Sequence, residues 1–231
     1  MLLGRDKSVK PLSSAPMGTS LTDPVWYACY GSNCSLARFS AYLVGGSAPG
    51  TTYVHPGARD PSPPQDAGPV VFASQICFTG HAESWGGAPA FLEHRPAERG
   101  AWGKRYLIGA GQFADIFDQE NRRAPGTSEL PDLASLHPGA LVDQGAGPYG
   151  TLVVLDPVEG VPCLSFTSPT PPEQQTPAAP SASYLRTIAQ GLYETHRVSL
   201  QELVDHLLRA PGVTPAWDQE SIRALLGAVA N

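Results

Sequence analysis

The stretch Val25–Leu43, VWYACYGSNCSLARFSAYL, constrains the fold of this chain more than any other segment. Its first six residues, Val25–Tyr30, are mostly apolar or aromatic and predict a buried strand. Gly31-Ser32-Asn33 then predicts a tight polar turn. The residues after the turn predict an amphipathic helix, whose apolar positions are Leu36, Phe39, Ala41 and Leu43. We therefore expect a strand, turn and helix in direct succession.

A turn of this kind has one functional interpretation and one purely structural one. The first backbone N–H groups of a helix lack intrahelical partners and lie at the positive end of the helix dipole, so they form a receptor for a carboxylate, a phosphate or a carbonyl oxygen. Gly31 would let a ligand approach the backbone closely, and Ser32 and Asn33 are both good N-caps. The alternative is a capped strand–helix junction that binds no ligand, which is common in α/β folds.

The composition limits the classes of partner and compartment. Of 231 residues, 15 are Lys or Arg and 21 are Asp or Glu, and no basic run of five or more occurs, which argues against nucleic acid. The N-terminus lacks an apolar stretch of signal-peptide length, and no window approaches a membrane span. The four cysteines are too sparse for a disulfide scaffold and form no CxxC pair, so we expect the cytoplasm.

Strands and helices alternate irregularly along the chain. The predicted strands are Val25–Tyr30, Pro69–Thr79, Ala88–Leu92, Gly103–Ile108, Tyr149–Asp156 and Val161–Thr167, of which the last two form a hairpin. Beyond the first helix, the predicted helices are Gly109–Arg122, Ala182–Thr195, Ser199–Arg209 and Asp218–Val229, and Ser199 with Glu202 matches a capping box. The irregular connections argue against a doubly wound fold and favour a mixed sheet curled toward a barrel.

The 24 Gly and 24 Pro residues are concentrated between these elements. We expect a flexible lead-in over residues 1–23 and a single domain over residues 24–231. That domain carries Pro- and Gly-rich insertions near residues 45–68, 123–148 and 168–181.

Glu120 is the second candidate feature. Phe113, Ile116 and Phe117 stand at positions i, i+3 and i+4 of the predicted helix, and Glu120 follows at i+7 on the same face. Burial in such a stripe raises the pKa of a carboxyl group and makes it a better base near neutral pH. The alternative places Glu120 beyond the stripe, at the surface or paired with Arg122 or Arg123.

Other candidates carry weaker signals. His81 and Glu83 precede Trp85-Gly86-Gly87 and suggest the edge of a site, although a loop histidine is usually solvated. The six histidines have no spacing typical of metal ligands. Cys29 or Cys34 would be a nucleophile in a thiol mechanism, but a buried cysteine more often serves as a small apolar residue.

Tyr27–Asn33, YACYGSN, resembles the Y-x-x-Y-G-S-N signature that opens domains of the γ-glutamylcyclotransferase-like family. The likeness continues in order through Trp85–Ala88, Trp102–Tyr106, Phe113–Asn121 and Pro180–Gly191, and covers about residues 25–210. Cys29 replaces the usual Ala, and Asn121 replaces the Gly that follows the family's acidic residue. These two departures leave the base in place but leave the substrate open.

The resemblance implies an α+β fold in which helices flank a small mixed β-barrel. It implies an enzyme of the transferase or lyase type that cyclises a γ-glutamyl amide or peptide to 5-oxoproline and releases an amine or amino acid. Glu120 would be the general base, with no metal and no cofactor. The implied substrate-binding residues are Tyr27, Ala28, Cys29, Tyr30, Gly31, Ser32, Asn33, Gly86, Gly87, Tyr149 and Tyr184.

Two other functions compete with this one. A non-catalytic small-molecule-binding protein would keep the same fold and pocket without turnover. A half-buried carboxylate at Glu120 favours the enzyme, because a binding protein gains little from it. A thiol-dependent acyl transferase using Cys29 or Cys34 lacks a recognisable His partner. The partner we expect is a small γ-glutamyl compound, with neither nucleic acid nor membrane; the sequence does not identify the released group or the oligomeric state.

Overall fold

The first strand of the sequence, β1 (Pro24–Cys29), lies inside the main sheet of the computed structural model, which describes residues 18–48, 51, 53–145 and 147–227. This sheet has six strands in the order β4-β7-β1-β10-β9-β8. The other five are β4 (Asp66–Val71), β7 (Trp102–Gly109), β8 (Leu141–Asp143), β9 (Thr151–Val158) and β10 (Val161–Thr167). Since β1 pairs parallel with β10 and antiparallel with β7, the predicted mixed sheet is confirmed.

The predicted barrel is not formed. The edge strands β4 and β8 are not paired with each other, so the main sheet is open within the described part of the chain. A separate two-stranded sheet consists of β5 (Ser74–Phe78) and β6 (Ala90–Pro96). The continuous strand predicted for Pro69–Thr79 is therefore wrong, because the chain leaves the main sheet between β4 and β5.

The reason for this break is a close crossing of two backbone segments. Phe72 N–H donates to the Ala101 carbonyl (2.8 Å), and Ala101 N–H donates to the Ser74 carbonyl (2.8 Å). A Cβ on Gly100 would overlap the Phe72 carbonyl, so only glycine allows the approach. These contacts turn the strand away from its neighbours before a barrel closes.

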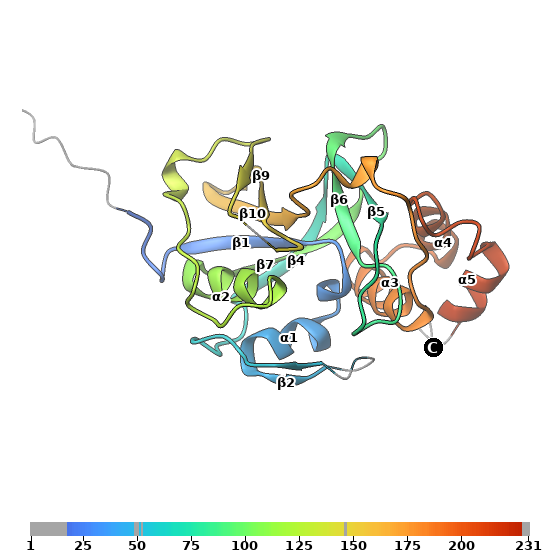
Figure 1. The fold of residues 1–231 in the computed structure, drawn as a ribbon, viewed down its shortest axis with the longest axis horizontal. Helices are drawn as coiled ribbons and strands as arrows, with labels where there is room; N and C mark the ends of the chain where they lie inside the picture. Colours follow the sequence, from blue (N-terminus) through green and yellow to red (C-terminus); the bar gives the residue numbers. More distant parts are fainter. Residues whose placement is uncertain (1–17, 49–50, 52, 146, 228–231) are drawn as a thin grey trace, which may run out of the picture.

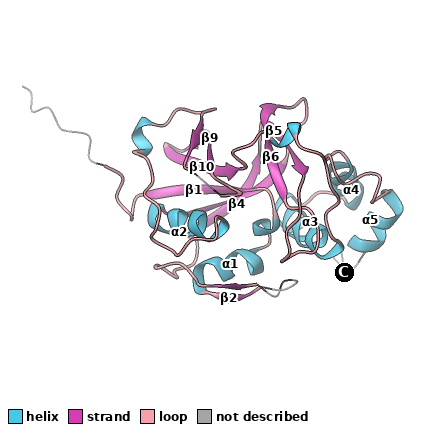
Figure 2. Cartoon of the chain, in the orientation of Figure 1, coloured by secondary structure: helices cyan, strands magenta, loops and turns pink. Residues whose placement is uncertain are grey.

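The helices lie in two groups (Figures 1 and 2). Helices α1 (Leu36–Val44) and α2 (Ala110–Glu120) lie together against the main sheet, below it in this view. Helices α3 (Ala182–His196), α4 (Leu200–Leu208) and α5 (Gln219–Leu226) gather at the end where β5 and β6 lie. The capping box predicted at Ser199 and Glu202 is present at the start of α4.

The turn after β1 differs from the predicted one. Residues Ser32–Cys34 form a short 3₁₀ helix, η1, and α1 begins only at Leu36, after Ser35. The Tyr106 hydroxyl donates to the Asn33 carbonyl at 3.0 Å and supports this extra turn. The strand therefore does not run directly into an α-helix, and α1 starts several residues beyond the Gly31-Ser32-Asn33 turn.

The core lies between β1 and the two adjacent helices. Tyr27 stacks on Phe166 with ring centroids 5.3 Å apart and meets Phe113 edge-on at 5.8 Å. The stripe predicted on α2 is confirmed, since Phe113, Ile116 and Phe117 are all buried. This packing fixes the orientation of α2 relative to the end of β1.

The three insertions contain short ordered elements. Residues 45–68 include the pair β2 (Gly46–Ser47) and β3 (Val54–His55), as well as the start of β4. Residues 123–148 contain the 3₁₀ helix η2 (Leu133–Ser135) and β8, and residues 168–181 contain η3 (Pro172–Gln174). The lead-in predicted over residues 1–23 falls mostly outside the described residues. In the described part, Thr19 Oγ1 accepts a hydrogen bond from Leu133 N–H at 2.9 Å.

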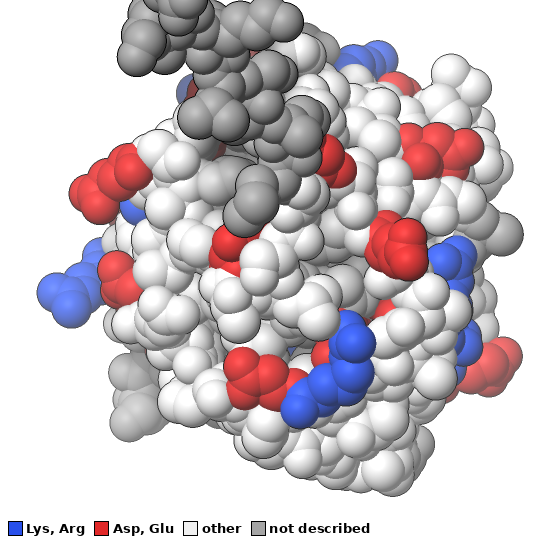
Figure 3. Space-filling model, turned by 90° about the vertical axis from the view of Figure 1, so that its left-hand side faces the viewer, with Lys and Arg blue, Asp and Glu red and all other residues white. Residues whose placement is uncertain are grey.

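The surface carries charges of both signs. On the face seen in Figure 3, Lys and Arg side chains are interspersed with Asp and Glu and do not gather into one basic patch. Among the described residues, each helix is too short or too polar to cross a lipid bilayer.

Candidate active site

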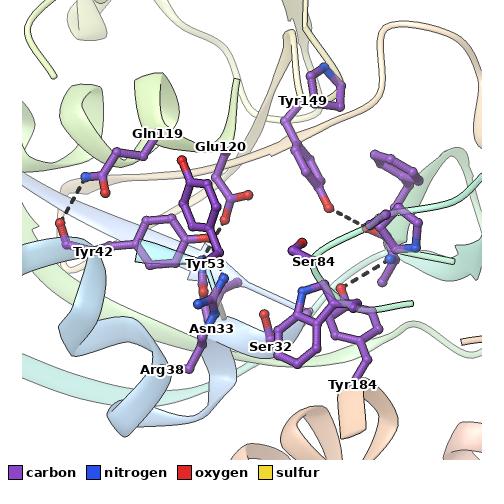
Figure 4. Close-up of a pocket in the computed structure, with 18 of the residues that line it drawn as sticks. Ser32, Asn33, Arg38, Tyr42, Tyr53, Ser84, Gln119, Glu120, Tyr149 and Tyr184 are labelled. Carbon is purple, nitrogen blue, oxygen red and sulfur yellow. Dashed lines mark hydrogen bonds between the residues drawn. The ribbon is translucent and has the colours of Figure 1, made fainter. Parts of the chain in front are cut away.

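A cavity of about 400 Å³ lies where the end of β1, the first helix, the end of α2 and the loop before β6 meet. Figure 4 shows its walls. Nine of the twelve site residues predicted from the sequence line it: Tyr27, Cys29, Tyr30, Gly31, Ser32, Asn33, Glu120, Tyr149 and Tyr184. Segments far apart in the chain thus place most of the predicted residues around one space.

Glu120 ends α2 and points into this cavity. Its Oε1 accepts a hydrogen bond of 3.0 Å from the Asn33 side-chain amide. Burial raises the pKa of the Glu120 carboxyl above its ordinary value, while a hydrogen bond with the Tyr42 hydroxyl and the charge of Arg38 lower it by smaller amounts. The carboxyl is thus oriented by Asn33, partly desolvated and adjacent to open space.

The alternative, in which Glu120 pairs with Arg122 at the surface, has little support. The charge of Arg122 lowers the pKa of the Glu120 carboxyl, but by less than Tyr42, Arg38 and Asn33 do. The Arg122 guanidinium lies 4.9 Å from the centre of the Tyr53 ring. No ion pair joins Arg122 to Glu120 within the described part of the chain. Arg122 has a left-handed backbone (φ 59°), so the chain turns sharply immediately after α2.

The other polar side chains of α2 are buried, and they hold neighbouring segments of the chain. Asp115 accepts from Arg59, whose Nη2 lies 2.9 Å from Oδ1. Asp118 accepts hydrogen bonds from the Thr127 N–H (2.8 Å) and the Ser128 hydroxyl (2.5 Å). An ordinary amphipathic helix exposes its polar face to water, whereas the polar side chains of α2 bind other segments of the protein.

Asn33 links three parts of the site. Its side-chain amide donates to both the Glu120 carboxylate and the Tyr27 hydroxyl, each at 3.0 Å. Its Oδ1 atom is buried and has no hydrogen-bond partner among the described residues. The predicted turn residue therefore acts here through its side chain, which holds the carboxylate of a helix 87 positions away.

Two tyrosines form the opposite wall. The Tyr149 hydroxyl donates to the Ala90 carbonyl (3.3 Å), and the Tyr184 hydroxyl accepts from the Ala90 N–H (3.2 Å). Asn121 fixes Tyr149 further, because its Oδ1 accepts from Tyr149 N–H at 3.0 Å. The Asn that replaces the family's Gly thus supports a residue lining the cavity.

Gly31 borders the cavity with ordinary extended geometry, at φ −100°. A Cβ at this position would lie 3.1 Å from the Tyr184 hydroxyl oxygen. A close approach to Tyr184, and not a left-handed backbone, is therefore the reason for glycine here.

Three of the predicted binding residues, Ala28, Gly86 and Gly87, do not line the cavity. Ala28 is fully buried, and its neighbours Tyr27 and Cys29, on the opposite face of the strand, line the cavity instead. Gly86 has a left-handed backbone (φ 64°) and forms a turn. Gly87 packs on the backbone of the segment before α3, where a Cβ would lie 2.5 Å from Ser181 N.

The two thiols proposed as nucleophiles are buried. Cys29 Sγ donates to the Lys104 carbonyl at 3.2 Å, and the Cys34 Sγ atom lies 3.9 Å from Cys29 Sγ. Burial raises the pKa of the Cys29 thiol well above its ordinary range, which disfavours the reactive thiolate. The arrangement gives the thiol mechanism no support.

Sequence reasoning missed several lining residues, of which Arg38 and Tyr42 are the most important. They stand at i and i+4 on α1, and Arg38 Nη2 donates to the Tyr42 hydroxyl at 3.5 Å. The i, i+4 spacing indicates from sequence alone that Arg38 and Tyr42 lie on one face of α1. Only the tertiary fold shows that this face is beside Glu120. The predicted pair His81 and Glu83 lines the cavity. Both side chains are exposed, and His81 Nε2 lies 3.8 Å from Glu83 Oε1.

The described residues also lack the clustered ligand side chains typical of metal sites. They contain no group of three or more His, Cys, Asp and Glu side chains suited to a metal ion. The absence of a cofactor stays a prediction.

Comparison with known proteins gives a fold but no family. No family model matches the sequence. The chain shares 28% identity over 225 residues with "Histone deacetylase 5" of Arabidopsis thaliana, which is 87% of this chain and 33% of that protein. The chain therefore spans about a third of that relative's length.

The fold is similar to that of solved structures. A structure of "Gamma-glutamyl cyclotransferase" aligns with a TM-score of 0.50 over 89% of this chain and 99% of its own, at 14% identity. An uncharacterized protein from Homo sapiens aligns with a TM-score of 0.49 over 90% of this chain and 99% of its own, at 15% identity. The α+β architecture of this chain is thus that of a γ-glutamyl cyclotransferase fold.

Proposed function

We propose that the protein cyclises a γ-glutamyl amide or peptide to 5-oxoproline, with Glu120 as the general base. The observation that carries this proposal is a carboxylate that ends a buried helix, faces a cavity and is held by Asn33. Its raised pKa suits a group that accepts a proton near neutral pH.

In the proposed reaction the substrate supplies both reacting groups. Glu120 takes a proton from the α-ammonium group, and the free amine attacks the γ-carbonyl carbon of the same molecule. The new C–N bond closes the five-membered lactam, and the former amide C–N bond breaks. Glu120 then returns its proton to the departing nitrogen, and the ring nitrogen gives up its second proton. The products are therefore 5-oxoproline and the released amine in its protonated form.

Positioning provides the rest of the acceleration. The substrate must be held bent, with its amine within attack range of its own carbonyl, and effective concentrations rise steeply when reacting atoms are held this way. The backbone of Tyr30–Ser32 would hold the glutamyl group on one side, and Tyr149 and Tyr184 would confine it on the other. The small cavity suits a substrate of this size.

The test is to incubate the purified protein with a panel of γ-glutamyl amides and peptides and to measure 5-oxoproline. We expect release from at least one member by the wild-type protein and about 10²–10⁴ times less by Glu120→Gln. A panel that yields no 5-oxoproline with well-folded protein would contradict the proposal.

The second candidate is a non-catalytic binding domain. Similarity to about a third of a protein named histone deacetylase 5 favours it, because a domain of this kind then occurs within a larger protein of another named activity. Binding of a γ-glutamyl compound without turnover, unchanged by Glu120→Gln, would identify this function.

We place the protein in the cytoplasm as part of the same proposal. All four cysteines are free and buried, which fits a reducing compartment.

A further inference from the structure

Arg38 is a buried cation that forms no ion pair among the described residues, although its charge acts on the nearby Glu120 carboxyl. Its side chain is 4% exposed, and its guanidinium carbon lies 5.2 Å from the ring centre of Tyr42 and 5.3 Å from that of Trp85. Its Nε and Nη1 atoms have no hydrogen-bond partner among the described residues, and the ion pairs found there do not include it. Buried charges in proteins are normally paired, so this arrangement needs an explanation.

The two aromatic rings explain only part of it. Cation–π contacts favour a guanidinium between Tyr42 and Trp85, but they compensate poorly for the loss of hydration of a full charge. Arg38 lines the same cavity as Ser32, Asn33 and Glu120. A ligand in that cavity can supply an anionic group that pairs directly with the guanidinium.

We propose that Arg38 binds the α-carboxylate of the γ-glutamyl group, as a specificity-determining residue that the resemblance did not indicate. This inference rests on the proposed function. The amine that Glu120 would deprotonate and the α-carboxylate are attached to the same carbon, so a cation beside Glu120 lies where that carboxylate would be. A planar guanidinium is also the side chain best suited to hold a carboxylate.

Binding tests this inference without any turnover. L-glutamine and its α-carboxamide share the γ-amide and the α-amine and differ only in the α-carboxylate. Titration calorimetry is done in the Glu120→Gln background, which lacks the proposed base, so that L-glutamine is not turned over. With Arg38 intact, we expect L-glutamine to bind at least about 30 times more tightly than the α-carboxamide. In Arg38→Met the two affinities should agree within about threefold, because Met keeps the apolar stem but not the charge. Arg186→Met, on the exposed face of α3, is the matched control and should keep the preference for L-glutamine.

The inference is overturned if Arg38→Met keeps the preference for L-glutamine, or if the protein with Arg38 intact has none. Arg38→Lys keeps the charge without the planar fork, so it should weaken L-glutamine binding about tenfold and leave α-carboxamide binding unchanged. Equal losses for both ligands in Arg38→Lys would indicate a structural role and also overturn it. This second variant keeps the test valid if Arg38→Met does not fold.

Turnover separates this inference from the proposed function. With a γ-glutamyl anilide, Arg38→Met should lower kcat/KM about 100-fold, mostly through KM. A wild-type protein that forms no 5-oxoproline, together with a preference for L-glutamine that depends on Arg38, would refute the proposed reaction and support the carboxylate subsite.

Discussion

The substitution Glu120→Gln tests the proposed base most directly. Gln keeps the size and shape of the side chain, and its Oε1 can still accept the 3.0 Å hydrogen bond from Asn33. The variant therefore loses basicity and charge but little geometry. We expect kcat to fall about 10²–10⁴-fold, which corresponds to about 3–5 kcal/mol of activation free energy. Substrate affinity should change much less, because other residues hold the substrate.

The pKa of Glu120 also predicts how stability depends on pH. Burial raises this pKa, so the folded state binds the proton more tightly than the unfolded chain does. The contribution of Glu120 to stability is then complete below its unfolded pKa and is lost as pH rises through the folded value. Gln cannot ionise, so the melting temperature of Glu120→Gln should equal or exceed that of the wild type at pH 8. The gap between them should close toward pH 4.

Steady-state kinetics, 5-oxoproline detection and thermal unfolding on one preparation decide between catalysis and structure. The wild-type kcat/KM should rise with pH through the raised pKa of Glu120, since only the carboxylate accepts a proton. Glu129→Gln, an exposed carboxyl in the loop after α2, is the matched control. A folded Glu120→Gln protein with kcat within about threefold of wild type would refute the general-base role, and a lower melting temperature with unchanged kcat would make Glu120 structural.

Three further predictions concern other parts of the molecule. Gly31→Val should abolish turnover with only a modest loss of melting temperature, because the added carbon at 3.1 Å displaces the Tyr184 hydroxyl at the cavity wall; undiminished activity would remove this turn from the site. The Cys29→Ala, Cys34→Ala double variant should stay active and form no covalent adduct by intact-mass measurement, since burial raises the pKa of Cys29 well above its ordinary range; inactivity in a folded protein would restore the thiol mechanism. Burial lowers the pKa of His206 to about 3, so the unfolded chain binds the extra proton below about pH 6.5 and stability falls on acidification, by about 2–3 kcal/mol at pH 4.5. Urea unfolding at pH 7 and 4.5 should show a smaller acid loss for His206→Leu, and an unchanged loss would contradict this cause.

The sequence predicted the elements whose signals are local. Strand Val161–Thr167 and its hairpin partner follow from β-branched residues around a turn, and the structure contains both. The stripe on α2 follows from helical spacing alone. The open sheet could not be predicted from local signals. The break after β4 depends on the close approach of Gly100 to Phe72, which belongs to another segment of the chain.

The site was predictable only where a motif or a periodicity marked it. Asn33 and Glu120 were both identified, although no local pattern indicates that the Asn33 amide donates to the Glu120 carboxylate. Arg38 was missed because its burial depends on Trp85, which lies 47 positions further along the chain and reaches it only in the fold. The burial of Asp115 could not be predicted either, because its partner Arg59 belongs to an insertion that is distant in the sequence.

The carboxylates of α2 have a consequence for how substrate range can diversify. Asp115 holds the insertion before β4 through Arg59, and Asp118 holds the insertion after α2 through Ser128, while the same helix ends in Glu120. Changing loop length costs little in chain entropy when the ends stay fixed. Both loops can therefore be exchanged between these two anchors, in nature or in a designed library, while the proposed base stays in place.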